Sequence, residues 1–307
     1  MSAMPRITVI GSINMDLVIR APRLPRTGET LFGEGFSMVP GGKGANQAVT
    51  AARIGAQVTF VGKVGRDIFG EELRTSLARE RVDTRYLFTD DHAATGVALI
   101  VIDNSGDNSI LVAPGANMRC NPEDVDAAAE ELAAADVLLL QLEIPLETDD
   151  YAISLAKRHQ VPVILDAGPA SQRAVSNLKQ IDILSPNETE AEALTGVKVS
   201  GLKGAEQACR SLLSKGVGTV VLKLGAQGAM IGDRDGIRHI PGVKVHVVDT
   251  TAAGDAFTAA LAVALGEGKG IDEVVVWANH VGALTVTRLG AQTSLPTREE
   301  VDRFIKP

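Results

Sequence analysis

Short apolar runs alternate along the chain with segments in which apolar residues recur every three or four positions. The runs have the length of buried β-strands, and the segments between them have the period of amphipathic helices. Strands that are apolar throughout and separated by helices indicate a mostly parallel sheet between two helical layers, a three-layer α/β fold. The predicted strands are Ile7–Ile10, Val58–Val61, Val137–Leu142, Val161–Leu165, Ile181–Leu184 and Thr219–Leu224, and the clearest helices are Phe69–Glu80, Pro122–Ala134 and Ala205–Lys215.

Two regions, 16–39 and 96–113, break this rhythm because each contains strand patterns with no helix between them. The second region is typical of a β-hairpin around a polar turn over 103–108. Four strands without helices indicate a small separate sheet, and we expect it to form a lid inserted into a single α/β domain over 1–307. The lid strands are predicted at Leu17–Arg20, Thr30–Val39, Val97–Ile102 and Ser109–Ala113.

Composition narrows the class of function. Acidic residues outnumber basic ones by 38 to 30, so the chain has no general field that attracts nucleic-acid backbones. Aromatic residues make up only 3%, which argues against stacking platforms for nucleic-acid bases. The two cysteines, Cys120 and Cys209, form no C-x-x-C motif, and no apolar run is long enough to span a membrane. We expect a reduced, cytoplasmic protein that binds neither nucleic acid nor membranes.

A glycine-rich cluster over 41–46, Gly-Gly-Lys-Gly-Ala-Asn, precedes a predicted helix over 47–54. Glycines at such a place let a ligand approach backbone amides, and Lys43 adds a compact positive charge suited to a phosphate or a sugar hydroxyl. A plain turn with Asn46 as the helix cap explains the spacing equally well. The cluster is not a Walker A loop, and no G-x-G-x-x-G dinucleotide fingerprint occurs in the chain.

A second cluster, over 249–255, reads Asp-Thr-Thr-Ala-Ala-Gly-Asp. Its small residues Ala252, Ala253 and Gly254 would expose N–H groups to an incoming anion. Asp255, in the first helical turn, would take a proton from a hydroxyl while these amides hold phosphate charge. The alternative is that Asp255 only caps the helix or complements its dipole. The flanking elements are predicted as a strand over Val243–Val248 and a helix over Ala256–Leu265.

Polar residues also follow several other predicted strands. Asn187 and Glu190 have the spacing of a capping box, which alone explains both, although at a strand end they could order water around Mg²⁺. Asn14 and Asp16 could engage neighbouring hydroxyls of a polyol or simply form a turn, and Glu143 is a further carboxylate at a strand end. The segment Gly225–Gly228 is either a turn or a backbone cradle for a nucleotide.

Taken together, the clusters at 41–46 and 249–255 resemble the two signatures of the PfkB-type carbohydrate kinases. The resemblance spans essentially the whole chain, and among family members it is strongest to those that phosphorylate D-ribose. It implies ATP-dependent transfer to the 5-hydroxyl, giving D-ribose 5-phosphate, and a homodimer paired through the lid sheets. The other matching segments are Gly11–Asp16, Thr95–Ala98, Pro186–Glu190 and Gly290–Gln292.

The resemblance also implies roles for individual residues. Those that match sugar contacts are Asn14, Asp16, Gly42, Lys43, Asn46 and Glu143, with Asp255 as the catalytic base and Ala252, Ala253 and Gly254 around the anion hole. Those that match the nucleotide site are Asn187, Lys223, Gly225, Gly228, Gly254 and Asn279, with Glu190 near Mg²⁺. Those that match a site for a monovalent cation, usually K⁺, several through backbone carbonyls, are Asp249, Thr251, Thr285, Arg288, Gly290 and Ser294.

Three residues depart from the commonest family pattern. Ala252 stands where the wider family more often has Gly, Lys223 where Thr is frequent, and Asn279 where His is frequent. Two rival functions stay open: a related kinase of deoxyribose or another close sugar, and a sugar or nucleotide sensor without turnover. The presence of Asp255 argues against the sensor, because a pure binding protein needs no base.

Overall fold

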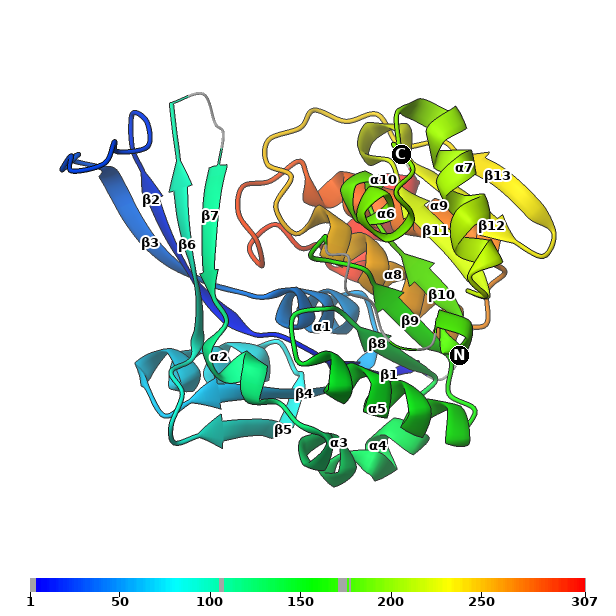
Figure 1. Cartoon of the computed structure of the whole chain (residues 1–307), viewed down its shortest axis with the longest axis horizontal. Helices are drawn as coiled ribbons and strands as arrows, with labels where there is room; N and C mark the ends of the chain where they lie inside the picture. The colour runs from blue at the N-terminus through cyan, green and yellow to red at the C-terminus, as the bar shows by residue number, and fades with distance from the viewer. Residues whose placement is uncertain (1–3, 105–107, 171–175, 177, 307) are drawn as a thin grey trace.

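The main β-sheet of the computed structural model has the order β13-β12-β11-β10-β9-β8-β1-β4-β5 within the described residues, which are 4–104, 108–170, 176 and 178–306 (Figure 1). Neighbouring strands are parallel except at the β11-β12-β13 end, so the predicted mostly parallel sheet is confirmed. The strands are β1 Arg6–Ile10, β4 Gln57–Gly65, β5 Asp83–Asp90, β8 Val137–Leu140, β9 Val163–Asp166, β10 Ile183–Ser185, β11 Thr219–Lys223, β12 Ala229–Asp233 and β13 Gly236–Ile240.

Helices cover both faces of this sheet and enclose two apolar cores (Figure 1). In β8, Val137 and Leu139 point into one core while Leu138 and Leu140 point into the other, as expected for a strand buried on both faces. One layer contains α1 Lys43–Arg53, α2 Ile68–Arg79, α8 Ala253–Gly266, α9 Ile271–Thr285 and α10 Arg298–Ile305. The other contains α3 Pro122–Ala127, α4 Ala129–Ala133, α5 Leu146–Arg158, α6 Glu188–Thr195 and α7 Gly201–Ser214. No helix in the described part of the chain is long and apolar enough to cross a membrane.

The predicted second sheet is also confirmed, with the strand order β3-β2-β6-β7. These strands project from the body of the molecule (Figure 1). At the base of this lid sheet Asn14 pairs with both Gly41 and Gly96, so the lid is rooted beside the start of α1. Residues 105–107 of the expected hairpin turn lie outside the described residues. The lid strands are β2 Asn14–Arg20, β3 Glu34–Gly41, β6 Gly96–Ile102 and β7 Asn108–Ala113.

Several expectations about single elements were wrong, and among them the lid strand expected from Thr30 begins only at Glu34. No strand forms over Val243–Val248, all of which the structure describes; Val247 and Val248 are about half exposed, and the backbone of Val248 bonds to Val286 instead of a neighbouring strand. The helix expected over Pro122–Ala134 divides into α3 and α4 at Ala128. The strand expected from Val161 begins at Val163, after Pro162, which has no N–H to donate to a sheet.

The carboxyl group of Asp149, on α5, is fully buried, and neither of its oxygens has a hydrogen-bond partner among the described residues. Burial, aided by the nearby charge of Asp150, raises the pKa of Asp149 well above its ordinary value. The folded state therefore holds a proton that the unfolded chain releases, and the free energy of unfolding falls as pH rises above the ordinary Asp pKa, until the folded pKa is passed.

We predict that Asp149→Asn, which is neutral at every pH, becomes more stable than the wild type as pH rises. The difference in unfolding free energy should be near zero at pH 4 and reach at least about 1 kcal/mol at pH 8. Urea unfolding of both proteins at a series of pH values measures this difference and cancels the contributions of other groups. A difference that does not change with pH would contradict the assignment.

Candidate active site

The start of α1 packs against the connection between β1 and β2. Gly42 precedes the helix with φ of 90°, and a Cβ at this position would lie 2.8 Å from the backbone nitrogen of Asn14, so only glycine fits without displacement. The amide of Ala45 donates to the carbonyl of Ser12 at 2.9 Å. Asn46 lies inside the helix and Gly42 precedes it, so the interpretation of Asn46 as the cap is wrong. The side chains of Lys43 and Asn46 are therefore available to face the centre of the molecule.

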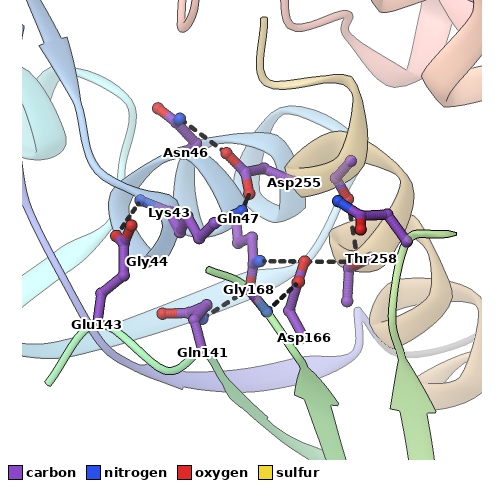
Figure 2. Close-up of polar contacts among 12 residues, drawn as sticks. Lys43, Gly44, Asn46, Gln47, Gln141, Glu143, Asp166, Gly168, Asp255 and Thr258 are labelled. Atoms are coloured by element: carbon purple, nitrogen blue, oxygen red, sulfur yellow. Dashed lines mark hydrogen bonds and ion pairs between the residues drawn. The ribbon is translucent and has the colours of Figure 1, made fainter. Parts of the chain in front are cut away.

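The starts of α1 and α8 face each other, and this brings Asp255 together with two residues of α1 (Figure 2). Asn46 Nδ2 donates to Asp255 Oδ2 at 2.9 Å, and Lys43 Nζ lies 3.5 Å from Asp255 Oδ1. Asp255 is 5% exposed, and its Oδ1 has no hydrogen bond from any described residue. One carboxylate oxygen is thus held in place while the other is left for a further partner. The cap interpretation of Asp255 does not account for this arrangement.

Two more carboxylates lie within electrostatic reach of Asp255. Burial, together with repulsion from Glu143 and Asp255, raises the pKa of Asp16 to about 7. Burial also raises the pKa of Glu143, although Lys43 and a short hydrogen bond from Ser12 Oγ oppose this shift. Asp16 comes from the lid and Glu143 from the loop after β8, so the body and the lid both contribute to this group.

Lys43 is the cation in the middle of these acids. Burial disfavours its charged form, but the surrounding carboxylates outweigh this effect and raise the pKa of Lys43 above its ordinary value. Because Gly168 has no side chain, the ammonium can sit beside it: a Cβ there would lie 2.8 Å from Lys43 Nζ and 2.6 Å from Glu190 Oε1. The four carboxylates that act on Lys43 are those of Asp255, Asp166, Glu143 and Glu190.

Sequence reasoning missed a buried network beneath this centre. Asp166 at the end of β9 is fully buried and accepts from Gln47 Nε2 at 3.1 Å, Thr258 Oγ1 at 3.0 Å and Lys223 Nζ at 3.1 Å (Figure 2). Burial opposes ionisation, but Lys223 and Lys43 hold the pKa of Asp166 below its ordinary value. The signal was present in the sequence, because Asp166 ends an apolar strand just as Glu143 follows one.

The start of α8 has the features expected of an anion-binding site. Within the described residues no side chain caps the helix, so no side chain competes with an anion for its first amides. The amide of Ala253 makes one long hydrogen bond, 3.3 Å, to the carbonyl of Thr250. Ala252, just before the helix, has φ of 60°, a left-handed conformation that is unfavourable for a residue with a Cβ.

The residues expected on the nucleotide side meet at the ends of β10 and β11. Asn187 and Glu190 form a capping box at the start of α6, which confirms the capping interpretation, and only Oε2 of Glu190 is used in it. Gly225 and Gly228 bound a short helical turn after β11. Asn279 Nδ2 donates to the carbonyl of Pro241 at 3.1 Å, beside the backbone that Gly228 contacts.

The six residues expected at the cation site lie on the loop before α8, at the end of α9 and on the loop that follows α9, and hydrogen bonds join the two loops. Asp249 accepts from the amide of Thr251 at 2.9 Å and from that of Gly290 at 2.8 Å. Thr285 and Ser294 are buried. The guanidinium of Arg288 is paired with Glu300 and has no oxygen, so Arg288 could offer a cation only its backbone carbonyl. Among the described residues no group of three or more His, Cys, Asp or Glu has the arrangement of a metal site.

A cleft of about 610 Å³ opens between the lid sheet and these loops. Its walls include Asp16 and Arg20 from β2 and the backbone of 249–251, which leads to the start of α8. A volume of this size is typical of small-molecule sites. Of the carboxylates grouped around Lys43 and Asp255, only Asp16 lines this cleft, and its lining residues do not include Asp255 or Glu143.

Comparisons with known proteins identify relatives over nearly the whole chain. Residues 4–298 match the pfkB family carbohydrate kinases. The chain is 42% identical over 300 residues to a ribokinase of Haemophilus influenzae, covering 98% of each chain, and 37% identical to a deoxyribokinase of Salmonella typhi, covering 97% of this chain and 98% of that one. Its structure matches that of Arabidopsis thaliana ribokinase complexed with ribose and ATP with a TM-score of 0.93 and 36% identity, over 99% of this chain and 100% of the other.

The strained backbone at Ala252 gives a prediction about stability. Ala252→Gly should raise the free energy of unfolding by about 0.5–1 kcal/mol, because relief of the left-handed strain exceeds the added freedom of the unfolded chain. Ala253→Gly is the matched control: residue 253 is helical, so glycine there should lower stability by about 0.5–1 kcal/mol. Urea unfolding measures both. Equal losses in the two variants would rule out strain at residue 252.

Proposed function

The chain belongs to the pfkB family of carbohydrate kinases, and we propose that it transfers the γ-phosphoryl group of ATP to the 5-hydroxyl of D-ribose. The observation that carries this proposal is the Asp255 carboxylate at the start of α8. Its Oδ1 lies 3.5 Å from Lys43 Nζ and accepts no hydrogen bond from a described residue, and no side chain of the described residues caps the helix. The Haemophilus relative and the Arabidopsis complex with ribose and ATP support the choice of substrates.

Asp255 acts as the base in this mechanism. Its Oδ1 takes the proton of the 5-hydroxyl as the sugar oxygen attacks the γ-phosphorus. A new oxygen–phosphorus bond forms, the bond between the γ-phosphorus and its bridging oxygen breaks, and ADP leaves. Asn46 fixes the orientation of Asp255, and the Lys43 ammonium lies beside its Oδ1.

The sugar is held by the remaining polar groups of α1 and the lid. Asp16 and Glu143 accept hydrogen bonds from sugar hydroxyls, and Asn46 Oδ1, which is buried without a partner among the described residues, supplies another acceptor. The backbone of Gly42 and Asn14 lies beside these side chains and borders the sugar site. The lid, as part of one kinase domain, closes over the sugar and excludes water, which protects ATP from hydrolysis.

The start of α8 receives the transferred group. The amides at residues 252–254 face the phosphate oxygens, while Asn187 and the segment 223–228, with Asn279, form the nucleotide side. Glu190 fits a role near Mg²⁺ because its Oε1 is not used in the capping box and lies beside Gly168. Bound to the phosphates, Mg²⁺ would neutralise part of their charge and keep several of its waters.

The loops at 249–251 and 285–294 fit a monovalent cation such as K⁺. Their donors are oxygens: the Asp249 carboxylate, the hydroxyls of Thr285 and Ser294, and backbone carbonyls such as that of Arg288. A bound cation would stabilise the loop that leads directly into residues 252–254 and so would fix the amides there. A reduced, cytoplasmic environment is consistent with two cysteines that are both free and buried.

Deoxyribose is the second candidate substrate. The Salmonella relative, a deoxyribokinase, is nearly as similar to the chain as the ribokinases are. Asp16 could tolerate a missing hydroxyl at some loss of affinity. Comparison of kcat/KM for ribose and deoxyribose with the purified protein decides between them.

We predict that Asp255→Asn lowers kcat by at least about 100-fold while the affinity for ribose changes little, because the amide keeps the shape but cannot accept the proton. A coupled assay of ADP formation gives kcat, and isothermal titration calorimetry gives ribose affinity. Asp235→Asn, at an exposed turn, is the matched control and should behave as the wild type. Turnover of Asp255→Asn close to the wild-type rate would reject Asp255 as the base.

The outer face of the lid sheet supports a homodimer. Register places Ile19 opposite Phe36 and Leu99 opposite Leu111, on the face of the sheet that alternates with the cleft-lining Val18 and Ile100. Of these four residues only Phe36, near the edge of the sheet, also lines the cleft. All four are exposed. An exposed apolar face of this kind is typical of an interaction surface, and two such faces pack well against each other.

We predict that the double variant Met38→Glu/Leu111→Glu is monomeric at concentrations where the wild type is a dimer. Both side chains are exposed on this sheet, 55% and 70%, and paired charges there would be buried in the interface. Ile68→Glu, also highly exposed but on α2, is the control that should leave the dimer intact. Sedimentation velocity measures the masses. A monomeric wild type, or a dimeric double variant, would refute the proposed interface.

A further inference from the structure

Asn117 is a buried asparagine just beyond the lid, on the short helix η1 Gly115–Arg119. Its side chain reaches the connection between β1 and β2. There Oδ1 accepts from the amide of Ile13 at 2.9 Å, and Nδ2 donates to the carbonyl of Ile13 at 3.0 Å and to Asn14 Oδ1 at 2.7 Å. Both polar atoms of this side chain are therefore engaged within the protein, and Asn117 itself is not directed to a ligand.

These hydrogen bonds determine the orientation of two side-chain amides. A backbone N–H can only donate and a backbone carbonyl can only accept, so the two contacts with Ile13 allow one orientation of the Asn117 amide. Its Nδ2 therefore faces Asn14, and Asn14 has to present its oxygen there. The Asn14 side chain makes no other hydrogen bond among the described residues, so its Nδ2 is left for a ligand.

The elements around this contact hold it in place. Gly96, the first residue of β6, pairs with Asn14, and a Cβ at residue 96 would lie 2.2 Å from Asn14 Oδ1 and 2.4 Å from Asn117 Nδ2. A larger residue there would push the two amides apart. On the other side of η1, Lys63 Nζ donates to the carbonyl of Arg119 at 2.9 Å. The position of Asn117 is thus set by the lid and by the body of the molecule.

The polarity of Asn14 matters because several of the other groups expected around the sugar are acceptors. In its ring form D-ribose has four hydroxyl groups, and each carries one hydrogen but two lone pairs. In the proposed function an acceptor is available for each of these hydrogens, so a further side chain can bind only by donating to a hydroxyl oxygen. The acceptors are Asp16, Glu143, Asn46 Oδ1 and Asp255 Oδ1.

We propose that Asn117 is a positioning residue for sugar recognition: it holds the amide of Asn14 with Nδ2 toward the sugar, so that Asn14 donates to a hydroxyl oxygen. The inference rests on the proposed kinase function and deepens it. Asn117 does not touch the substrate and acts only through Asn14. Without Asn117 the Asn14 amide can turn its oxygen to a sugar that has no hydrogen left for it.

A double-mutant cycle on ribose affinity distinguishes positioning from a merely structural role. Isothermal titration calorimetry on the full chain would compare the wild type, Asn14→Ala, Asn117→Ala and the double variant. Each single substitution should weaken ribose binding about 3- to 10-fold, because one hydrogen bond to the sugar is lost or misdirected. In the Asn14→Ala background the change at residue 117 should alter ribose affinity by less than about 2-fold, because no amide is left to orient.

ATP affinity and a second asparagine serve as controls. ATP affinity should stay within about 2-fold of the wild type in every variant, since the contact lies on the sugar side. Asn121, in the same segment, caps α3 with its side chain. Asn121→Ala should lower the melting temperature but leave ribose affinity within about 2-fold of the wild type.

Circular dichroism shows whether each variant is folded. If Asn117→Ala is not, Asn117→Asp replaces it, alone and with Asn14→Ala. Aspartate keeps an acceptor for the amide of Ile13 but offers no NH₂ group to Asn14, so the same loss and the same dependence on Asn14 are expected.

Losses that multiply in the double variant would overturn the proposal, because Asn117 would then act independently of Asn14. Unchanged ribose affinity in a folded Asn117 variant would overturn it too, as would an equal loss of ATP affinity or an equal loss of ribose affinity in Asn121→Ala. Failure of both Asn117 variants to fold, or a wild type that does not bind ribose, would also overturn it. Absence of phosphorylation by a wild type that binds ribose would reject the proposed function alone, because the binding comparison needs no turnover.

Discussion

The ammonium of Lys43 holds the charged centre of this molecule together. Lys43 is surrounded by carboxylates that come from four parts of the chain: the start of α8, the end of β9, the loop after β8 and the start of α6. Each would be costly to bury alone. Because Gly42, just before α1, has no side chain to keep the helix away from the β1–β2 connection, Lys43 lies among Asp255, Asp166 and Glu143 (Figure 2). The position of α1 is therefore set by electrostatics as well as by packing.

The burial of several charged groups around Lys43 also leaves hydrogen-bond acceptors free for a substrate. Burial, with repulsion from neighbouring carboxylates, holds Asp16 and Glu143 above their ordinary pKa values, and Asn46 Oδ1 and Asp255 Oδ1 accept no hydrogen bond from the described residues. In the proposed mechanism a sugar supplies hydroxyl donors for these acceptors, and its 5-hydroxyl loses a proton beside them. Binding and proton transfer would then use groups that are already oriented, and such orientation is the main source of rate in phosphoryl transfer.

The sheet, the lid and the two signature clusters could be predicted from the sequence because apolar periodicity and glycine placement are local signals. The wrong strand over Val243–Val248 shows the limit: its residues have a strand pattern, but no neighbouring strand is available, and Val248 bonds to Val286. Asp166, Gln47 and Thr258 were missed because only the fold brings β9, α1 and α8 to one point. Nothing in the sequence shows which face of the lid Leu99 and Leu111 occupy, and only strand register assigns them to one face.

The most direct test of the account is a crystal structure of the chain with D-ribose and a non-hydrolysable ATP analogue. The account predicts that the 5-hydroxyl oxygen lies within about 2.6–3.2 Å of Asp255 Oδ1 and points to the terminal phosphorus at the start of α8. A complex in which the 5-hydroxyl bonds elsewhere, with Asp255 still contacted only by Asn46 and Lys43, would contradict it.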